Sequence, residues 1–320
     1  MHSGHMSEAG VGMPAGRVSA PVVSVVLVGW NSGRYLEGCL RSVFSGELGS
    51  AFEVILVDNK SSDDSVALVR ERFPQVRVIE NEQNVGFAAA ANQGIRASLG
   101  QYVLLLNCDT IVNGPSIDAM VEFMDEHHDA GAVGGRLLNP DGSFQSGAAE
   151  FSTLRQELLI ALRLGEVLHP GYPSHKVFSE VTTVDWMSGA CLLIRREAFG
   201  QVGPLDEDYF MYSEEVDWQF RLKRAGWSVY YLPHVSTIHY GGGSQDRWRR
   251  RRMVYGGKIL FYSKNYRYAK ALALRCMLGT VSLLKLAVWS VLWLLRVGLA
   301  RTGKELSSNR DVLWTCLRTR

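Results

Sequence analysis

The chain has 320 residues, of which 47% are hydrophobic and 21% charged, so it can build one large α/β domain and is not globally disordered. The formal net charge of +2 conceals two opposite parts. Residues 1–246 carry 17 Lys and Arg against 30 Asp and Glu, whereas residues 247–320 carry 17 against 2. Net charges of −13 and +15 predict two surfaces with different partners.

The five cysteines are far apart and form no CxxC pair. A zinc site or a disulfide framework is therefore not expected, and a reducing, cytoplasmic compartment fits. Residues 1–20 lack the basic segment and apolar run of a signal peptide, and we expect them to form a flexible leader.

The next hundred residues alternate strand and helix patterns. Strands are predicted from continuous apolar runs at 22–28, 54–57, 76–79 and 102–106. Helices are predicted between them at 35–45, 63–73 and 87–98. This rhythm predicts a doubly wound, mostly parallel sheet that binds its ligands at the carboxyl ends of the strands.

The following residues are less regular. We expect a helix at 116–127, a strand at 132–137 and loops on the acceptor side at 139–180, with regular structure again from 184 to 194. A helix at 214–225 and a strand at 229–232 close the body. We divide the body into two halves, 21–115 and 116–246, and treat 247–320 as an extension.

The extension opens with RWRRRR at 247–252 and continues with an apolar stretch at 269–300. Only Arg275, Lys285 and Arg296 interrupt that stretch, and on a helix they fall within an arc of about 80°. Its longest uncharged run is about half of the roughly 20 residues that span a bilayer. An amphipathic helix or helical hairpin in the plane of an anionic membrane surface is predicted. Packing on the catalytic domain or on a second subunit is the alternative.

Polar residues follow the predicted strands at Asn31, Asp58, Asn59 and Asp109, and should converge on one crevice. A carboxylate at Asp109 could hold a divalent metal beside a diphosphate, and one at Asp58 could accept the imide N–H of uracil or thymine. Taken singly, either position could equally be a turn former.

Three further segments carry chemical potential. Small residues open a helix at 84–94, where an anion is favoured, and carboxylates and aromatics gather at 206–227 as sugar stacking and a general base require. His239 precedes a glycine run. No GxGxxG follows the first strand, which argues against a nicotinamide-dependent dehydrogenase.

Together these segments resemble glycosyltransferase family 2, in particular its bacterial rhamnosyltransferases. The matching stretches, in family order, are VSVVLVGWNS (23–32), VILVDNKSSDDS (54–65), NVGFAAAANQG (84–94), YVLLLNCDT (102–110), DWMSGACLLIRREAF (185–199), VGPLDEDYFMYSEEVDWQFRLKRAG (202–226) and HYGGGS (239–244). The resemblance implies the GT-A nucleotide-diphospho-sugar transferase fold, with a nucleotide-binding half at 21–115 and an acceptor and catalytic half at 116–246. It also implies an inverting, metal-dependent transfer of a sugar to a hydroxyl.

The resemblance also implies roles for residues. Glu215 stands where the family has its catalytic Asp, and Glu214 and Asp217 compete for that role. Asn107-Cys108-Asp109 occupies the family's DxD position, so Asp109, with His239, is the expected contact of Mg²⁺ or Mn²⁺. The expected donor-binding residues are Asn31, Asp58, Asn59, Asn84, Gly86, Phe87, Asn92, Asn107 and Asp109. The expected acceptor-side residues are Trp186, Ser188, Gly189, Tyr212 and Trp218.

By the same resemblance the donor is dTDP-rhamnose, with UDP-linked galactofuranose, GlcNAc or glucose as alternatives. The acceptor would be a polyprenyl-diphosphate-linked glycan of cell-wall, O-antigen or polysaccharide assembly, at the inner face of the cell membrane, and a homodimer is possible. Residues 245–248 match the QxxRW signature of processive synthases one residue short, so addition of a single sugar is expected.

Two other classes of function remain. RWRRRR could bind nucleic acid, but the acidic crevice would then be unused and no nucleic-acid partner is expected. Glu215 and Asn107 depart from the family pattern, which would also suit a non-catalytic sugar-binding subunit. Since the basic run begins after the last motif, we expect it to serve location and acceptor delivery rather than chemistry.

Overall fold

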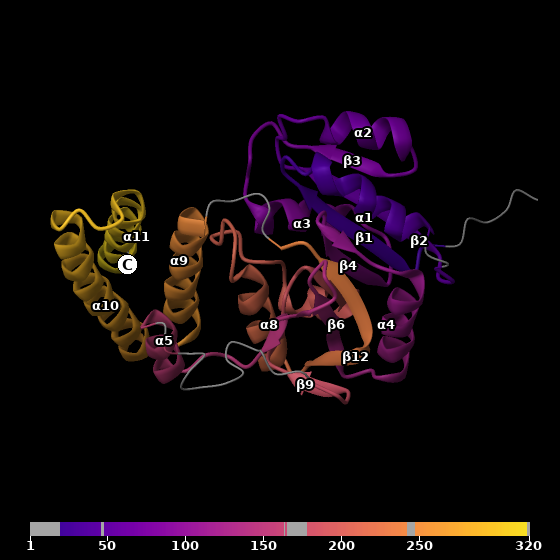
Figure 1. The fold of residues 1–320 in the computed structure, drawn as a ribbon. Coiled ribbons are helices and arrows are strands. Elements are labelled where there is room, and N and C mark those ends of the chain that lie inside the picture. Colours follow the sequence, from indigo (N-terminus) through magenta and orange to yellow (C-terminus); the bar gives the residue numbers. More distant parts are fainter. Residues whose placement is uncertain (1–19, 46–47, 163, 165–177, 242–246, 319–320) are drawn as a thin grey trace, which may run out of the picture.

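The computed structural model describes residues 20–45, 48–162, 164, 178–241 and 247–318. A mixed ten-stranded sheet has helices on both faces, and a group of helices from the end of the chain lies to one side (Figure 1). The predicted leader, apart from residue 20, lies outside the described residues, as do residues 242–246 of the HYGGGS and QxxRW segments.

The first half follows the predicted alternation of strands and helices. Its strands are β1 (Val23–Gly29), β2 (Phe52–Asp58), β3 (Arg77–Glu80) and β4 (Tyr102–Asn107). Its helices are α1 (Gly33–Ser45), α2 (Ser65–Arg72) and α3 (Phe87–Ala97). β1 pairs in parallel with β2 and with β4, and β3 extends the sheet beyond β2. The carboxyl ends of β1, β2 and β4 therefore lie at one edge, as predicted.

The second half is less regular and was predicted less well. Its elements are β5 (Thr110–Ile111), α4 (Gly114–Glu126), β6 (Ala130–Leu138), β7 (Phe144–Gln145), β8 (Ala148–Ala149), α5 (Leu154–Ala161), β9 (Thr182–Val184), β10 (Trp186–Met187), β11 (Cys191–Arg195), α7 (Arg196–Val202), α8 (Glu214–Arg224) and β12 (Ser228–His239). β11 lies antiparallel between β4 and β6. β12 continues past Pro233, where the strand was expected to end, because its pairing with β6 shifts register between Leu232 and Ser236 and spares the missing N–H.

Two apolar layers cover the sheet. Residues of α1, α2 and α4 bury one face, on alternate positions of β1 such as Val25 and Leu27. Residues of α3, α7 and α8 bury the other face, against positions such as Val26 and Leu105. This is the doubly wound arrangement expected of a parallel sheet covered on both sides.

The extension forms α9 (Arg247–Asn265), α10 (Tyr268–Leu294) and α11 (Leu299–Arg318). A third apolar cluster joins these helices to α5 and α8. Phe220 of α8 meets Phe261 of α9 edge to face, with ring centroids 5.4 Å apart. Lys258 binds the fully buried Glu157 of α5 at 2.8 Å. The start of the extension is thus packed on the catalytic domain, and part of its basic charge neutralises acids of that domain.

Arg275 and Lys285, two of the three charged residues that interrupt the apolar stretch, lie against the ends of other helices. Arg275 donates to the carbonyl of Cys316, near the end of α11, and Lys285 donates to that of Ala161, at the end of α5. Cations are stabilised at helix C-termini, where carbonyls lack partners, so both face the protein. Arg296 lies beyond the end of α10. The alternative of packing on the protein therefore holds for Arg275 and Lys285, and large apolar side chains of α10 are exposed.

The exposed apolar residues gather on the second half of α10 and around the turn to α11. They are Leu283, Leu284, Val288, Val291, Trp293, Leu294, Leu295, Val297 and Leu299, which we call the apolar tip. Among the described helices, α10 is the one that is long and apolar enough to cross a membrane, and a third of its apolar window is buried.

Candidate active site

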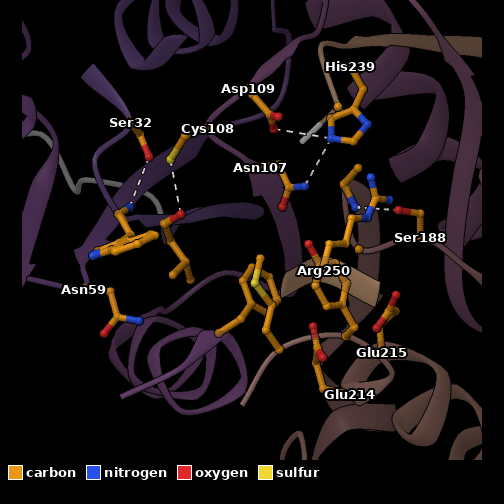
Figure 2. A pocket seen from close by; sticks show the side chains of 18 of the residues that line it. Ser32, Asn59, Asn107, Cys108, Asp109, Ser188, Glu214, Glu215, His239 and Arg250 are labelled. Carbon is orange, nitrogen blue, oxygen red and sulfur yellow. Dashed lines mark hydrogen bonds and ion pairs between the residues drawn. The ribbon is translucent and has the colours of Figure 1, made fainter. Parts of the chain in front are cut away.

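A cavity of about 460 Å³ lies where the carboxyl ends of β1 and β4 meet the starts of α8 and α9. Most of the residues expected at the site line it, and Figure 2 labels several of them, among them Asp109, Glu215 and His239. The expected residues that line it are Asn31, Asn59, Asn84, Gly86, Phe87, Asn107, Asp109, Trp186, Ser188, Gly189, Tyr212, Glu214, Glu215 and His239. Those that do not are Asp58, Asn92, Asp217 and Trp218.

Asp109 and His239 meet at one wall of this cavity. Asp109 follows β4 and His239 ends β12, and Asp109 Oδ1 lies 3.3 Å from His239 Nε2. The side-chain amide of Asn107 lies 3.4 Å from the same nitrogen. The antiparallel pairing of β12 with β5, which joins His239 to Thr110, brings the two segments together.

Gln145 fixes the imidazole of His239. The Gln145 Nε2 donates to Asn139 Oδ1 and to the His239 carbonyl, so its Oε1 faces His239 Nδ1, at 2.6 Å. Nδ1 then donates to Gln145, so Nε2 is the ring nitrogen that faces the Asp109 carboxylate. An oriented imidazole beside a carboxylate oxygen fits Mn²⁺ or Mg²⁺. No third His, Cys, Asp or Glu joins them among the described residues, so substrate oxygens and water would complete the set.

Cys108, between Asn107 and Asp109, is not part of this group. Its thiol is buried and donates to the carbonyl of Val28. Burial raises the pKa of the Cys108 thiol well above its ordinary value, which keeps it protonated. It lines the cavity as a small apolar residue.

Glu214 and Glu215 begin α8 on the opposite side of the cavity (Figure 2). Burial raises the pKa of both carboxyls, and the charge of Glu215 raises that of Glu214 further. The Oε2 atom of each is buried and has no hydrogen-bond partner in the described part of the chain. Buried carboxyls with raised pKa and an open oxygen at a cavity are suited to accept a proton from a hydroxyl.

The loop before these glutamates is strained and tightly enclosed. Tyr212 and Ser213 have φ of 72° and 77°, in the left-handed region that costs a non-glycine residue about 1 kcal/mol or more. Gly86 lies against one end of the loop: a Cβ there would stand 2.5 Å from the Phe210 carbonyl oxygen, which accepts a hydrogen bond from Phe87 N. The predicted anion position at the start of α3 therefore has one amide already used by the protein.

Gly257 of α9 lies against the other end of this loop. A Cβ at Gly257 would stand 2.5 Å from the Tyr212 carbonyl oxygen and 2.8 Å from Ser213 Oγ. Such contacts exclude any side chain, so α9 packs directly on the backbone that places Glu214 and Glu215. The extension thereby helps to shape the site.

Asp217, the third candidate base, connects two helices. Its Oδ2 accepts from Arg221 Nε at 2.8 Å, and its Oδ1 accepts from Asn265 Nδ2 at 2.6 Å and from the Tyr209 hydroxyl at 3.2 Å. It is buried and away from the cavity lining. Among the three candidates, Glu214 and Glu215 are the ones that face the cavity.

The residues expected around the donor base divide into two groups. Asn31 and Asn59 line the cavity. The side-chain amide of Asn59 donates to Asn84 and to the Gly86 carbonyl and accepts from Asn81 and Val85 N, so Asn59 holds the 81–86 segment in place. Asp58 is buried beneath them and accepts from Ser61 N, while its Oδ1 has no partner in the described residues. Its predicted contact with the base stays a prediction.

Two expected site residues lie in the core instead. Asn92 is fully buried and bonds both the N–H and the carbonyl of Leu205. Trp218 is fully buried under α7 and donates to the carbonyl of Gly203. Both were selected because they belong to motif segments, and periodicity does not tell which side of a helix faces the ligand.

The sequence analysis missed three cations at the cavity. Arg34 follows β1, and Arg249 and Arg250 lie in the first turn of α9. The arginine run itself was noted, but its position against α8 depends on tertiary packing. The basic run begins after the last motif in sequence, but two of its residues, Arg249 and Arg250, line the cavity together with Glu214 and Glu215.

Comparison with known proteins agrees with this geometry. The model of Glycosyl transferase family 2 matches residues 24–203. The chain belongs to this family. It is 34% identical over 247 residues to an N-acetylglucosaminyl-diphospho-decaprenol L-rhamnosyltransferase of Mycobacterium tuberculosis, covering 71% of this chain and 78% of that protein. It is 23% identical over 228 residues to the rhamnosyltransferase WbbL of Escherichia coli, covering 68% and 83%.

A solved structure supports the same fold. The mannosyltransferase PcManGT of Pyrobaculum calidifontis, in complex with GDP-Man and Mn²⁺, aligns with a TM-score of 0.57 at 16% identity, over 94% of this chain and 87% of that one. The protein is thus a family 2 hexosyltransferase with the predicted GT-A fold and a C-terminal helical extension, similar to rhamnosyltransferases.

Proposed function

We propose that this protein transfers one L-rhamnose from dTDP-rhamnose, with inversion, to a hydroxyl of a polyprenyl-diphosphate-linked glycan at the cytoplasmic face of a membrane. The observation that carries the proposal is the cavity in which Glu214 and Glu215 face the Asp109–His239 pair. Its support from relatives is the 34% identity to a protein whose name states this donor sugar and a diphospho-prenol acceptor.

The chemistry assigned to Glu215 is that of a general base. Its carboxylate takes the proton of the acceptor hydroxyl while that oxygen bonds to the anomeric carbon, and the bond from that carbon to the diphosphate oxygen breaks. The Glu215 side chain is one methylene longer than the Asp of the family. It lies in the first turn of α8, directly after the strained residues Tyr212 and Ser213. Glu214 is the remaining competitor because it shares the burial and the open oxygen.

Asp109 and His239 would hold the divalent cation, with Asn107 beside them. Such a cation would offset the negative charge that develops on the departing diphosphate. Gln145 keeps the His239 ring in the orientation that this contact needs.

A donor screen tests the proposal. Purified protein is incubated with dTDP-rhamnose and with UDP-linked galactofuranose, GlcNAc and glucose, with and without Mn²⁺ or Mg²⁺, and both thermal stability and transfer to a prenyl-diphosphate-linked GlcNAc are measured. Ligand binding to the native state raises its stability by mass action. Stabilisation and transfer with dTDP-rhamnose are expected. Transfer from a UDP-sugar instead would correct the donor, and binding without transfer or hydrolysis would indicate a non-catalytic subunit.

We also propose that the apolar tip lies at a membrane surface. Exposed Leu and Val side chains there are accompanied by Trp293, and the Arg301 guanidinium carbon lies 5.9 Å from the ring centre of the neighbouring Trp289. Trp beside Arg suits the interface between lipid tails and anionic headgroups. Cosedimentation with anionic vesicles tests this. A concentration-dependent dimer that no vesicle or detergent dissociates would point instead to a second copy of the chain on this surface.

A further inference from the structure

The four consecutive arginines at 249–252, at the start of α9, form two pairs with different surroundings. Arg251 binds the buried Glu305 at 2.8 Å and Arg252 binds Asp311 at 3.2 Å, both on α11. Arg249 and Arg250 line the catalytic cavity instead. Within the described residues neither forms an ion pair, although Glu214 and Glu215 line the same cavity.

The position of this second pair is set by packing. The contacts of Arg251 and Arg252 with α11 fix the rotation of α9. The close approach of Gly257 to Tyr212 fixes the distance of α9 from the loop that precedes Glu214. The Arg250 guanidinium carbon lies 5.7 Å from the centre of the Tyr212 ring, on the side of the cavity where Glu214 and Glu215 begin α8 (Figure 2). Two cations therefore line the same cavity as the carboxylates that the acceptor hydroxyl must reach.

The same end of the extension carries the apolar tip. Arg251 meets Glu305, Arg252 meets Asp311, and Gly256 lies near Thr315, so α9 and α11 run parallel while α10 runs back between their ends (Figure 1). Arg249 and Arg250 thus lie at the end where α10 stops and α11 starts. Leu299 precedes Glu305 by six residues, a rise of about 9 Å on a helix.

We propose that Arg249 and Arg250 form the binding site for the diphosphate of a prenyl-diphosphate-linked acceptor. This rests on the proposed function and names the subsite for its acceptor. The sugar of that acceptor reaches from the arginines to Glu215, and its hydrocarbon chain leaves toward the apolar tip. Guanidinium groups bind phosphate oxygens through paired, charge-assisted hydrogen bonds.

The chemistry of the cavity favours the acceptor over the donor at this position. The donor diphosphate has its expected place at the Asp109–His239 pair, on the opposite wall. A second diphosphate beside Glu214 and Glu215 would be repelled by the catalytic base once that carboxyl is ionised, unless cations lay next to it. Arg249 and Arg250 supply that charge and hold no carboxylate of the described chain that would have to be displaced.

The test compares full-length wild type with Arg249→Gln, Arg250→Gln and the double variant. Transfer is measured with a GlcNAc acceptor on a short prenyl diphosphate and with the neutral acceptor octyl β-GlcNAc. Each lost charge-assisted hydrogen bond weakens binding by roughly 10- to 100-fold. The KM for the diphosphate acceptor is expected to rise by that factor, while the KM for the donor and for the neutral acceptor stays within about twofold. Arg250→Lys should recover part of the loss because it restores charge without the planar fork.

A binding measurement needs no turnover. Farnesyl diphosphate should raise the thermal stability of wild type, farnesol should not, and the double variant should lose the response to farnesyl diphosphate. Arg310→Gln is the matched control. Arg310 is exposed on α11 and does not line the cavity, so this substitution removes the same charge at a distant position.

The outcomes separate this inference from the proposed function. A wild type that transfers to the diphosphate acceptor and a double variant with unchanged KM would overturn the arginine site alone. Loss of donor affinity in the variants would also overturn it, because the arginines would then bind the donor diphosphate. A wild type that transfers no sugar to any prenyl-diphosphate acceptor, yet binds farnesyl diphosphate through these arginines, would overturn the proposed function and leave the site standing.

Discussion

Gly257→Ala should damage catalysis from outside the cavity. The added Cβ would lie 2.5 Å from the Tyr212 carbonyl oxygen and 2.8 Å from Ser213 Oγ. Ordinary contact begins near 3.4 Å, so these atoms must move by about 0.9 and 0.6 Å. Overpacking of this kind costs about 1–3 kcal/mol. A displacement of about 1 Å in a catalytic group can lower the rate by roughly 100-fold, and the displaced atoms immediately precede Glu214 and Glu215.

Gly256→Ala is the matched control. A Cβ at Gly256 meets only Thr315 Cγ2, at 4.0 Å. Both substitutions gain about 0.5–1 kcal/mol of helix propensity. The difference between the two variants therefore isolates the contact with the loop, and corresponds to about 2–6 °C in Tm at roughly 2 °C per kcal/mol.

The assay combines thermal melts, nucleotide binding and initial rates of transfer. Gly256→Ala should match or exceed wild type in Tm and keep its kcat. Gly257→Ala should melt lower and lose roughly 10- to 100-fold in kcat with nucleotide affinity nearly unchanged. Equal kcat in the two variants, despite a lower Tm for Gly257→Ala, would refute the view that α9 positions the glutamates. Equal Tm as well would refute the close packing itself.

Three other predictions concern the cavity and the extension. Glu215→Gln should abolish transfer while nucleotide affinity is retained, and Glu214→Gln should keep measurable transfer; the reverse pattern of rates would make Glu214 the base. Burial raises the pKa of Glu214, so the contribution of this carboxyl to stability is largest below the ordinary carboxyl pKa and is lost as pH rises through the raised value. Glu214→Gln should therefore raise Tm at pH 7–8 and change it little at pH 4. A gain in Tm that is independent of pH would contradict this. Asp109→Ala should remove the metal dependence of donor binding, and equal donor affinity of wild type with and without Mn²⁺ would count against a cation there. Trp293→Ser with Leu294→Ser should reduce cosedimentation with anionic vesicles and leave transfer to octyl β-GlcNAc intact, whereas unchanged cosedimentation would remove the apolar tip as the membrane contact.

The raised pKa of the glutamates also gives the pH dependence of the reaction a direction. A base must be ionised to accept a proton, so transfer should fall as pH drops, and the fall should begin above the ordinary range of a carboxyl group. The profile of kcat/KM against pH measures this. If the rate instead falls at the ordinary carboxyl pKa, the base is not in the buried environment that Glu214 and Glu215 have in this structure.

The sequence alone determined the first half of the fold and the ends of its strands. Continuous apolar runs such as 22–28 and 102–106 are typical of strands in a parallel sheet covered on both faces, and the parallel pairing of these strands brings Asn31, Asn59 and Asp109 to one edge. The acidic start of α8 could be recognised for a different reason: carboxylates gather there among aromatic side chains, as a general base and sugar stacking require.

Only the tertiary structure decided which side chains of a motif face the ligand. Asn92 and Trp218 lie in motif segments but turn into the core, since helical spacing does not tell which face a neighbouring element will cover. It also decided how the extension is used. Arg275 and Lys285 turn inward because the carbonyls at the ends of α11 and α5 offer them partners, which leaves the apolar side outside.

The charge asymmetry along the chain takes its meaning from the same packing. The +15 of residues 247–320 is a sum over residues with different surroundings. Lys258 neutralises a buried acid of α5, Arg251 and Arg252 hold α11, and Arg249 and Arg250 face the catalytic cavity. Composition counts charges along a chain, whereas contact between segments far apart in sequence decides which of them are neutralised and which are open to a substrate.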